Sequence, residues 1–414
     1  MAGRAETVDP ARDERTRPQA WVVEQARAFG RACLAVRLPW RDRARYWAAY
    51  FGLAHRGEPV YSETHDAVYA DGRWKRGYEA ALERINRRLC AAGEREGFLA
   101  VPRFDPEQLS AADLRHLMGA NIPFLLSDGA RGLPVRDWTL DYFESVAGDC
   151  EVPINEARDE PDQDTSRPSK SHRYYQFRRG RLSEVVASIR AGGNARISTA
   201  EDVMHHNGGR LREDLCLEHW ERLSGWEANQ SHWLRSRLLA GKVVGAQLLM
   251  QPQNAFTLWH AEPGDNFFVL AQGTKTWTLA HPYYTAAMRP RVKTTTNYHG
   301  SNIDVREPDA VQRERGFGGY LAVPKVRVTL EPGDVLRVPN HWWHTAVTHP
   351  GSYTLAATIR SGGMPNRTGF GYTVLRWFDK QYHAMAVDYA KHGRIADRHI
   401  GHPRKSRGQA EAAR

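Results

Sequence analysis

The chain has 414 residues, 41% of them hydrophobic, so it can form one large domain with additions or two modest domains, each with a real core. It contains no run of about 18 apolar residues and no apolar N-terminal stretch, so we expect neither a membrane span nor a secretory signal. Four scattered cysteines without a CxxC pair suggest neither a zinc knuckle nor a disulfide framework, and the reduced cytoplasm is the simplest compartment. A net charge of +10 can attract nucleic acid or acidic peptides, but no nucleic-acid-binding motif accompanies it, so we do not expect a nucleic-acid partner.

The N-terminal part reads as a polar leader followed by helices. Residues 1–18 are charged and predict a disordered leader. The segments Trp21–Leu38 and Arg41–Leu53 have helical patterns. A third helix is indicated by four apolar residues that recur on one helical face, Tyr78, Leu82, Ile85 and Leu89. We therefore expect a helical extension over residues 19–117.

The middle of the chain mixes short elements. Asn121–Asp128 is a short apolar strand candidate, and Trp138–Glu144 resembles a short helix. Glu151–His172 is rich in Pro, Asp, Ser and charge, which predicts a flexible loop. Leu182–Ala191 is a short amphipathic helix.

Strands dominate after Lys242. The expected strands are short, rich in β-branched or aromatic residues and separated by Gly and Pro: Val243–Met250, Phe256–Ala261, Phe267–Ala271, Lys275–Ala280, Arg327–Leu330, Asp334–Val338 and Tyr353–Arg360. This pattern predicts an all-β sandwich or barrel. An amphipathic helical segment is expected at residues 363–390, and the tail from 391 to 414 is basic.

Two segments carry candidate metal ligands. In a strand, residues two apart point to the same face, so His260 and Glu262 of Thr257–Glu262 (TLWHAE) present a nitrogen and an oxygen donor together. Val338–Thr345 (VPNHWWHT) supplies His344. Two His and one carboxylate on one face leave positions open for other ligands, which is the arrangement of non-haem Fe(II) oxygenases. Asp265 has the wrong strand parity to join them.

A lysine near this motif suggests an anionic co-substrate. Lys275 lies in Asn266–Leu279 (NFFVLAQGTKTWTL), and a buried cation needs an anionic partner because an unpaired buried charge is costly. We interpret the distal carboxylate of 2-oxoglutarate as that partner. Thr257 and Asn266 are expected to add hydrogen bonds.

The motifs together resemble a known family. The chain is similar to the cupin-like JmjC oxygenases, nearest to the asparaginyl hydroxylase of hypoxia-inducible factor. The shared pattern reads here Thr257, His260, Glu262, Asn266-Phe267-Phe268, Gly273-Thr274-Lys275 and Gly333–His344. The resemblance covers residues 118–362. It implies a mainly β, double-stranded β-helix (jelly-roll or cupin) core, here with the N-terminal helical extension and a C-terminal helix.

The resemblance also implies roles for individual residues. His260, Glu262 and His344 would bind Fe(II), and Lys275, assisted by Thr257, would bind 2-oxoglutarate. The hydroxylase has Asp as its acid and a Tyr near the segment that here reads Ala195–Ser198 (ARIS). Its final strand carries an Asn where this chain offers Thr358 and Arg360, so these two are candidates for co-substrate binding.

The expected activity is hydroxylation of an unactivated C–H bond with O₂, coupled to decarboxylation of 2-oxoglutarate to succinate and CO₂. The substrate is a peptidyl or amino-acid side chain or a biosynthetic small molecule. N-demethylation remains open, as do a 2-oxoglutarate-independent cupin dioxygenase or isomerase and a non-enzymatic cupin. By family analogy the C-terminal helix is expected to mediate a homodimer. The equal alternative is that this helix only covers the barrel of its own chain.

Overall fold

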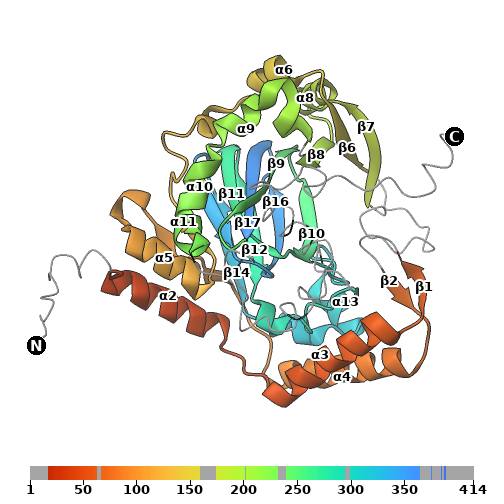
Figure 1. Ribbon diagram of the computed structural model, residues 1–414. Helices are drawn as coiled ribbons and strands as arrows, with labels where there is room; N and C mark the ends of the chain where they lie inside the picture. Colours follow the sequence, from red (N-terminus) through yellow and green to blue (C-terminus); the bar gives the residue numbers. More distant parts are fainter. Residues whose placement is uncertain are drawn as a thin grey trace, which may run out of the picture.

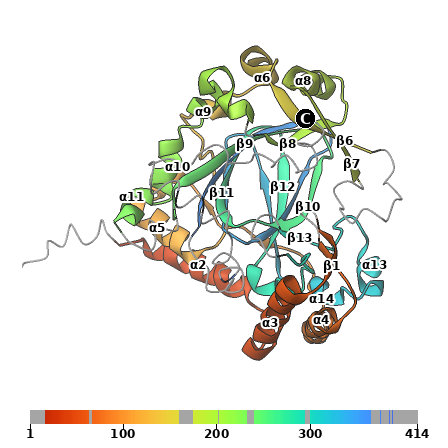
Figure 2. The same ribbon diagram turned by 45° about the vertical axis from the view of Figure 1, so that its right-hand side comes forward.

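Two β-sheets form the centre of the molecule (Figures 1 and 2). The computed structural model describes residues 17–62, 67–158, 174–200, 202–231, 239–293 and 299–363, together with the single residues 374, 384 and 387. The smaller sheet has the strand order β13 (His299–Gly300), β10 (Phe256–Ala261), β16 (Trp343–Thr348), β12 (Lys275–Ala280), β14 (Lys325–Leu330) and β3 (Leu99–Ala100). The larger sheet has the order β4 (Arg103–Phe104), β5 (Phe124–Leu126), β15 (Val335–Val338), β11 (Gly264–Gln272), β17 (Thr354–Gly362), β9 (Val243–Gln251), β8 (Ala195–Ala200), β6 (Glu151–Ala157) and β7 (Tyr175–Arg181).

The chain alternates between the two sheets in its C-terminal half. Strands β9, β11, β15 and β17 belong to the larger sheet, whereas β10, β12, β14 and β16 belong to the smaller one. This alternation with antiparallel pairing is the double-stranded β-helix of cupins. The jelly-roll fold class predicted from the sequence is therefore confirmed.

The main core lies between the sheets because both present apolar residues to the interior. Phe268 and Leu270 of β11 and Trp277 and Leu279 of β12 belong to one buried cluster. The rings of Phe268 and Trp277 pack edge to face with centroids 4.8 Å apart. Burial of such a side chain stabilises the fold by about 1.5–3 kcal/mol, so this cluster fixes how the sheets face each other.

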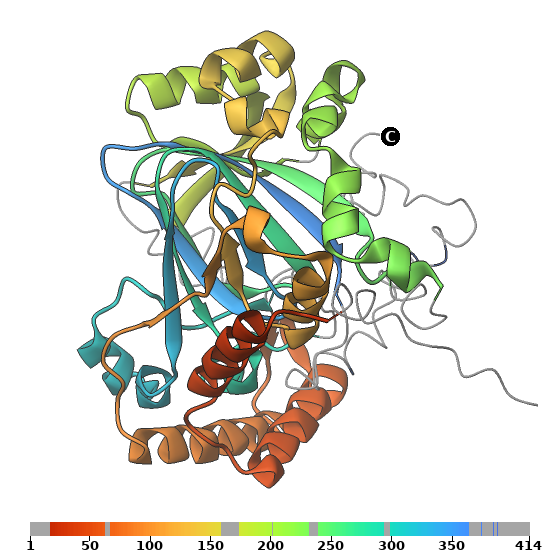
Figure 3. The ribbon, with the colours of Figure 1, turned by 90° about the vertical axis from the view of Figure 1, so that its left-hand side faces the viewer.

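Helices cover the outside of the barrel. Helices α3 (Trp40–Arg56) and α4 (Arg73–Ala91) lie below it in Figure 1, and their buried residues join a second cluster with Trp259 and Ala280 of the smaller sheet. The predicted stripe on α4 is buried, as expected. In Figure 3, α2 (Ala20–Cys33) crosses the side facing the viewer, where it packs on α5 (Ala111–Ala120). Within the described residues the other α-helices are α6 (Leu140–Ala147), α8 (Leu182–Arg190), α9 (Arg210–Asp214), α10 (Leu217–Leu223), α11 (Trp226–Gln230), α13 (Asp309–Glu314) and α14 (Gly318–Leu321).

Some predicted elements differ from the structure. The loop predicted at Glu151–His172 is wrong over its first residues, because Glu151–Ala157 forms β6 and pairs with β7 throughout. Of the charged residues in that segment, Glu151 and Glu156 belong to β6, where they form ion pairs with Arg179 and Arg178 of β7. The hairpin of β1 (Pro59–Ser62) and β2 (Ala67–Tyr69) was not predicted, and β3 and β4 join the core sheets from within the expected helical extension.

Three predictions fall wholly or mainly outside the described residues: the leader at 1–18, the later part of the loop, and the C-terminal segment at 363–390 with its tail. Among the residues that the structure describes, no helix is both long and apolar enough to cross a membrane.

Candidate metal and co-substrate site

The two histidines face each other across neighbouring strands. His260 of β10 pairs directly with His344 of β16, and their ring centroids are 4.1 Å apart. The register between β10 and β16 shifts between Thr257 and His260, at a β-bulge or a similar irregularity of the pairing. Glu262 follows the strand, and its carbonyl accepts a 2.6 Å hydrogen bond from the amide N–H of His341. The loop before β16 is thereby fixed beside the acid.

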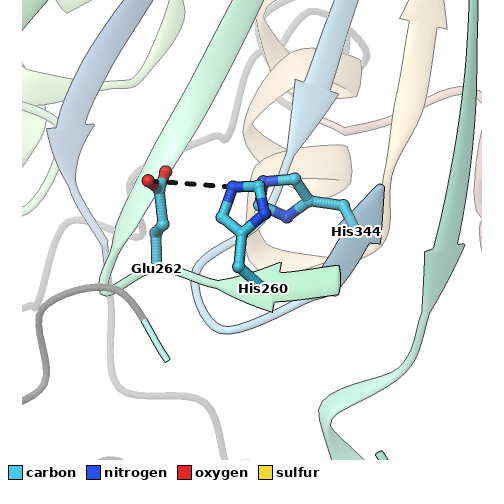
Figure 4. Close-up of side chains that lie close together, drawn as sticks. All are labelled: His260, Glu262 and His344. Atoms are coloured by element: carbon cyan, nitrogen blue, oxygen red, sulfur yellow. Dashed lines mark ion pairs between the residues drawn. The ribbon is translucent and has the colours of Figure 1, made fainter. Parts of the chain in front are cut away.

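The side chains of His260, Glu262 and His344 converge, as Figure 4 shows. Their ligand atoms all lie within 4.8 Å of one another, and Nε2 of His260 is 4.0 Å from Oε1 of Glu262. Each imidazole uses Nδ1 to reach the carbonyl of the residue two positions before it, Leu258 O at 2.8 Å and Trp342 O at 2.9 Å. A carbonyl only accepts, so Nδ1 carries the hydrogen and Nε2 keeps its lone pair.

The protonation states suit metal binding. Burial lowers the pKa of His260, and burial together with the charge of His260 lowers the pKa of His344 to about 3. Burial by itself would raise the pKa of Glu262, but the charge of Arg360, joined in acid by the imidazoles once they are protonated, outweighs burial and lowers that pKa to about 2. At neutral pH the site therefore offers two neutral imidazoles and a carboxylate, which are the ligating forms.

Arg360 is placed beside the acid. Its Nη2 donates to Oε1 of Glu262 at 2.8 Å, and its side chain is 24% exposed. Arg360 was predicted to bind the co-substrate, and the structure places its guanidinium on the candidate metal ligand Glu262. A guanidinium at this place orients the carboxylate and keeps it ionised.

Lys275 is buried further along the same barrel. Lys275 lies two residues before Trp277 on β12, and Trp277 packs against His344 with ring centroids 5.4 Å apart. The ammonium donates to Oε1 of Gln251, and the lysine is only 1% exposed. Burial, and secondarily the charge of Arg196, lower the pKa of Lys275 to about 7. Lys275 is thus a buried basic residue on the face of β12 that carries Trp277, and its binding of a co-substrate stays a prediction.

The other predicted residues have mixed placements. Thr257 accepts from the amide of Ala346 at 3.0 Å, so its hydroxyl holds β10 to β16. Asn266 and Thr358 share a face of the larger sheet with Phe268, and both are buried. The Thr358 hydroxyl donates to Gln247 at 3.4 Å, while Oδ1 of Asn266 has no hydrogen-bond partner in the structure.

Asp265 points to the opposite face, where it accepts hydrogen bonds from Arg337 at 3.0 Å and from the amide of Asn340 at 2.9 Å. The structure therefore places this carboxylate away from the candidate ligands, as its strand parity predicted.

Comparison with known proteins identifies the family. The family model described as cupin-like domain matches residues 110–384. The chain belongs to this family. The match supports a cupin/JmjC-type domain, a superfamily in which Fe(II) and 2-oxoglutarate are common cofactors, and it encloses every candidate site residue.

Curated relatives of this cupin-like chain show two kinds of similarity. The HSPB1-associated protein 1 homolog of Danio rerio is 39% identical over 82 residues, which are 20% of this chain and 17% of that protein. The human HSPB1-associated protein 1 is 37% identical over 82 residues, 20% of this chain and 16% of that protein. The lysine-specific demethylase 8 of Xenopus tropicalis is 22% identical over 298 residues, 70% of this chain and 60% of that protein. The chain thus spans about a sixth of the first two relatives.

Sequence reasoning missed two polar residues in this cupin-like barrel. Arg196 of β8 is 5% exposed, and Gln251 at the end of β9 is fully buried. A usable signal existed for Gln251, because Gln247 and Gln251 share one face of an otherwise apolar strand. Arg196 lies in Ala195–Ser198, the segment where the resemblance to the hydroxylase implied a Tyr that this chain does not have. Its proximity to the site depends on pairing with β9, which no local pattern reveals.

Proposed function

We propose that this cupin-like protein is an Fe(II)- and 2-oxoglutarate-dependent oxygenase. The observation that carries the proposal is the convergence of two neutral imidazoles and an ionised carboxylate on one side of a barrel that also buries Lys275. This donor set fits the facial triad of non-haem iron oxygenases, and the lysine fits an acidic co-substrate. A cupin isomerase or a 2-oxoglutarate-independent dioxygenase has no evident use for this lysine.

Each side chain has a defined task in the proposed reaction. Nε2 of His260, Nε2 of His344 and the Glu262 carboxylate would hold Fe(II), and Lys275 would bind the distal carboxylate of 2-oxoglutarate. When bound, iron and 2-oxoglutarate supply the oxidation chemistry, in which O₂ is consumed and succinate and CO₂ are released. Arg360 keeps Glu262 ionised and oriented, and the apolar core around Phe268 and Trp277 excludes bulk water. Asn266, Thr257 and Thr358 remain supporting candidates for co-substrate contacts.

The proposed substrate is a peptidyl or amino-acid side chain, or a small molecule of a biosynthetic pathway, with hydroxylation as the reaction. The closer likeness to the asparaginyl hydroxylase rests on the sequence motifs. N-demethylation is a second candidate because one relative over 70% of the chain is named a lysine-specific demethylase. A homodimer through residues 363–390 also stays a prediction, since that segment lies outside the described residues apart from Gly363 and three isolated positions.

The decisive experiment measures succinate formed from 2-oxoglutarate by the full chain with Fe(II), O₂ and ascorbate, with and without pools of peptides and small-molecule extracts. We expect succinate with wild type, none with His344→Ala, and unchanged turnover with His116→Ala on α5 as the matched control. Mass spectrometry of the pools then separates gain of an oxygen atom from loss of a methylene group. Wild-type protein that neither binds 2-oxoglutarate nor forms succinate would refute the proposal.

A further inference from the structure

A cavity of about 340 Å³ lies outside the barrel, between the N-terminal helices and the segment 289–292. Its walls include α3, α4 and β2, which Figure 1 shows in the lower part of the molecule. None of the candidate metal ligands and none of the predicted co-substrate residues lines it. The amide of Arg291 donates to Gly300 O at 2.9 Å, and Gly300 pairs with His260, so strand β13 separates this wall from the candidate metal ligand. The volume lies in the range of small-molecule sites, about 300–1,000 Å³.

Apolar and aromatic side chains form most of the lining. Leu53 of α3 and Tyr78 of α4 are buried, and Tyr69 of β2 and Phe317 add two further aromatic rings. The hydroxyl of Tyr78 donates to Pro290 O at 3.3 Å, which fixes α4 against the facing segment. A lining of this kind accepts an apolar body, preferably a flat one that packs against aromatic surfaces.

The lining also carries more positive than negative charge. Among the described residues that line the cavity, the cations are Lys75, Arg289 and Arg291, and the carboxylate is Glu79. Lys75 and Glu79 lie one turn apart on α4, so the charges of this wall balance. The excess positive charge belongs to the facing segment, where it favours an anion in the cavity.

Arg289 brings a cation to this cavity without an acid of its own. Its Nη2 donates to Gly316 O at 2.6 Å, and its guanidinium carbon lies 5.1 Å from the centroid of the Phe317 ring. Both partners are neutral. Burial lowers the pKa of Arg289, and the weaker attraction of Tyr78 and Glu83 opposes that shift. The part of the chain that the structure describes forms no ion pair with Arg289, so its Nε and Nη1 donors are available to a carboxylate.

The backbone at Arg289 is strained. Its φ is +49°, in the left-handed region that residues with a side chain rarely adopt. Hydrogen bonds hold the peptide there, from Arg289 N to Ala286 O at 3.2 Å and from Asn302 N to Arg289 O at 2.9 Å. Gly or Asn suits this conformation better, so folding alone gives no reason for an arginine at this position. A strained backbone that carries an uncompensated cation to a cavity is typical of binding sites.

We propose that this cavity binds a small aryl carboxylate, with the guanidinium of Arg289 on the carboxylate and the apolar lining around the ring. The site goes beyond the proposed oxygenase function and does not depend on it. An arginine fork donates two parallel hydrogen bonds to one carboxylate, which gives the ligand a fixed orientation. A ligand with several charges, such as a phosphate ester, fits less well because most of the lining is apolar.

Two probes of nearly equal size test the site, 3-phenylpropanoate and its neutral amide, 3-phenylpropanamide. Isothermal titration of the metal-free full chain gives both dissociation constants without a metal that could attract the carboxylate. We expect the acid to bind about 10-fold or more tightly than the amide, the usual contribution of hydrogen bonds to a charged group. Acetate, which has the carboxylate but no ring, should bind much more weakly than the acid.

Three variants locate the probe. Arg289→Asn removes the cation and suits the positive φ, so it should fold, lower the affinity for the acid to that for the amide and leave the amide unchanged. Val68→Trp on β2 enlarges a side chain that lines the cavity and is 41% exposed, so it should block both probes. Arg84→Gln on the exposed face of α4 is the matched control for the lost charge and should change neither affinity.

Four results would overturn the site. They are equal affinity of the wild type for acid and amide, wild-type affinity for the acid in folded Arg289→Asn, unchanged binding in Val68→Trp, and no binding of the acid at all. Should Arg289→Asn fail to fold, the comparison of acid with amide and the Val68→Trp variant decide. In a last arm, Mn(II) and 2-oxoglutarate are added and should leave the affinity for the acid unchanged, whereas displacement would place the probe in the barrel and overturn the site as well.

Discussion

Replacing Lys275 with Met should stabilise the ligand-free protein while removing its co-substrate binding. Burial and the charge of Arg196 lower the pKa of this lysine from 10.5 to about 7. At about 1.4 kcal/mol per pKa unit, holding the ammonium inside the barrel costs the folded state about 5 kcal/mol when the group is protonated in both states. Met retains much of the apolar volume without the charge.

The sign and pH range of this effect follow from proton linkage. Because the folded pKa lies below the unfolded one, the unfolded chain binds the extra proton between pH 7 and 10.5, and stability of the wild type rises with pH in that window. Below pH 7 the full penalty applies. The gain in free energy of unfolding that Lys275→Met obtains by removing the buried charge should therefore fall from about 5 kcal/mol at pH 6 to about 2 kcal/mol at pH 9. Loss of the Lys275–Gln251 hydrogen bond lowers the stability of the variant by about 1–3 kcal/mol at both pH values. This loss cancels when the two pH values are compared, so the stability gain should still change by about 3 kcal/mol between pH 6 and pH 9.

Urea unfolding of metal-free protein, followed by tryptophan fluorescence at pH 6 and pH 9, measures this change. Lys75→Met on the partly exposed face of α4 is the matched control and should show no pH-dependent difference from wild type. After loading with Mn(II), the same proteins should show loss of 2-oxoglutarate binding in Lys275→Met and not in Lys75→Met. A stability difference that is equal at both pH values would show that Lys275 is hydrated in the free protein and would refute the reasoning.

Three further outcomes are expected. His344→Ala should weaken Co(II) binding more than about 100-fold, because the loss of a ligand exceeds the loss seen for residues that only support ligands. Optical titration measures the affinity, and a variant that binds Co(II) as tightly as wild type would exclude His344 as a ligand. Arg360→Gln should raise the pKa of Glu262, so Co(II) binding should fall more steeply below pH 6 than in wild type while remaining similar at pH 8, and parallel pH profiles would contradict this. Gly273→Ala should destabilise the fold by about 1–3 kcal/mol or more, because the φ of Gly273 is +84° and an added Cβ would lie 1.8 Å from Tyr353 O. Gly351→Ala is the control, since Gly351 has a φ of +72° but open space around the added Cβ, and thermal unfolding should show a smaller loss of stability for it.

Local patterns predicted the strands that carry the site. Phe256–Ala261 and Lys275–Ala280 have the predicted bounds, since β-branched and aromatic residues in short runs between turns report strand structure directly. The β6–β7 hairpin was missed because its exposed residues are charged and its pairing spans a segment rich in Pro and Asp. The strand β16 was not recognised although His344 was, because Trp342 and Trp343 mask its alternation.

The candidate site was predictable only where its residues are close in sequence. Strand parity brings His260 and Glu262 together and excludes Asp265, and the structure agrees on both points. The partners of these residues could not be predicted in the same way. Arg360 reaches Glu262 across 98 positions, and Gln251 precedes Lys275 by 24 positions in another sheet. Such contacts depend on which strands become neighbours, and a single sequence does not encode that in any local period.

The buried charges divide according to whether the chain itself neutralises them. The buried Arg337 pairs with Asp265, and the buried Asp304 pairs with Arg306, so each of these buried charges has its partner and serves the fold. Lys275 has instead a neutral amide and a repelling arginine, an arrangement that destabilises the folded state. Stability alone gives no reason to keep such a group, because Met would fill the space at lower cost. The uncompensated lysine is therefore better explained by an anion that enters the barrel during function than by any contribution to folding.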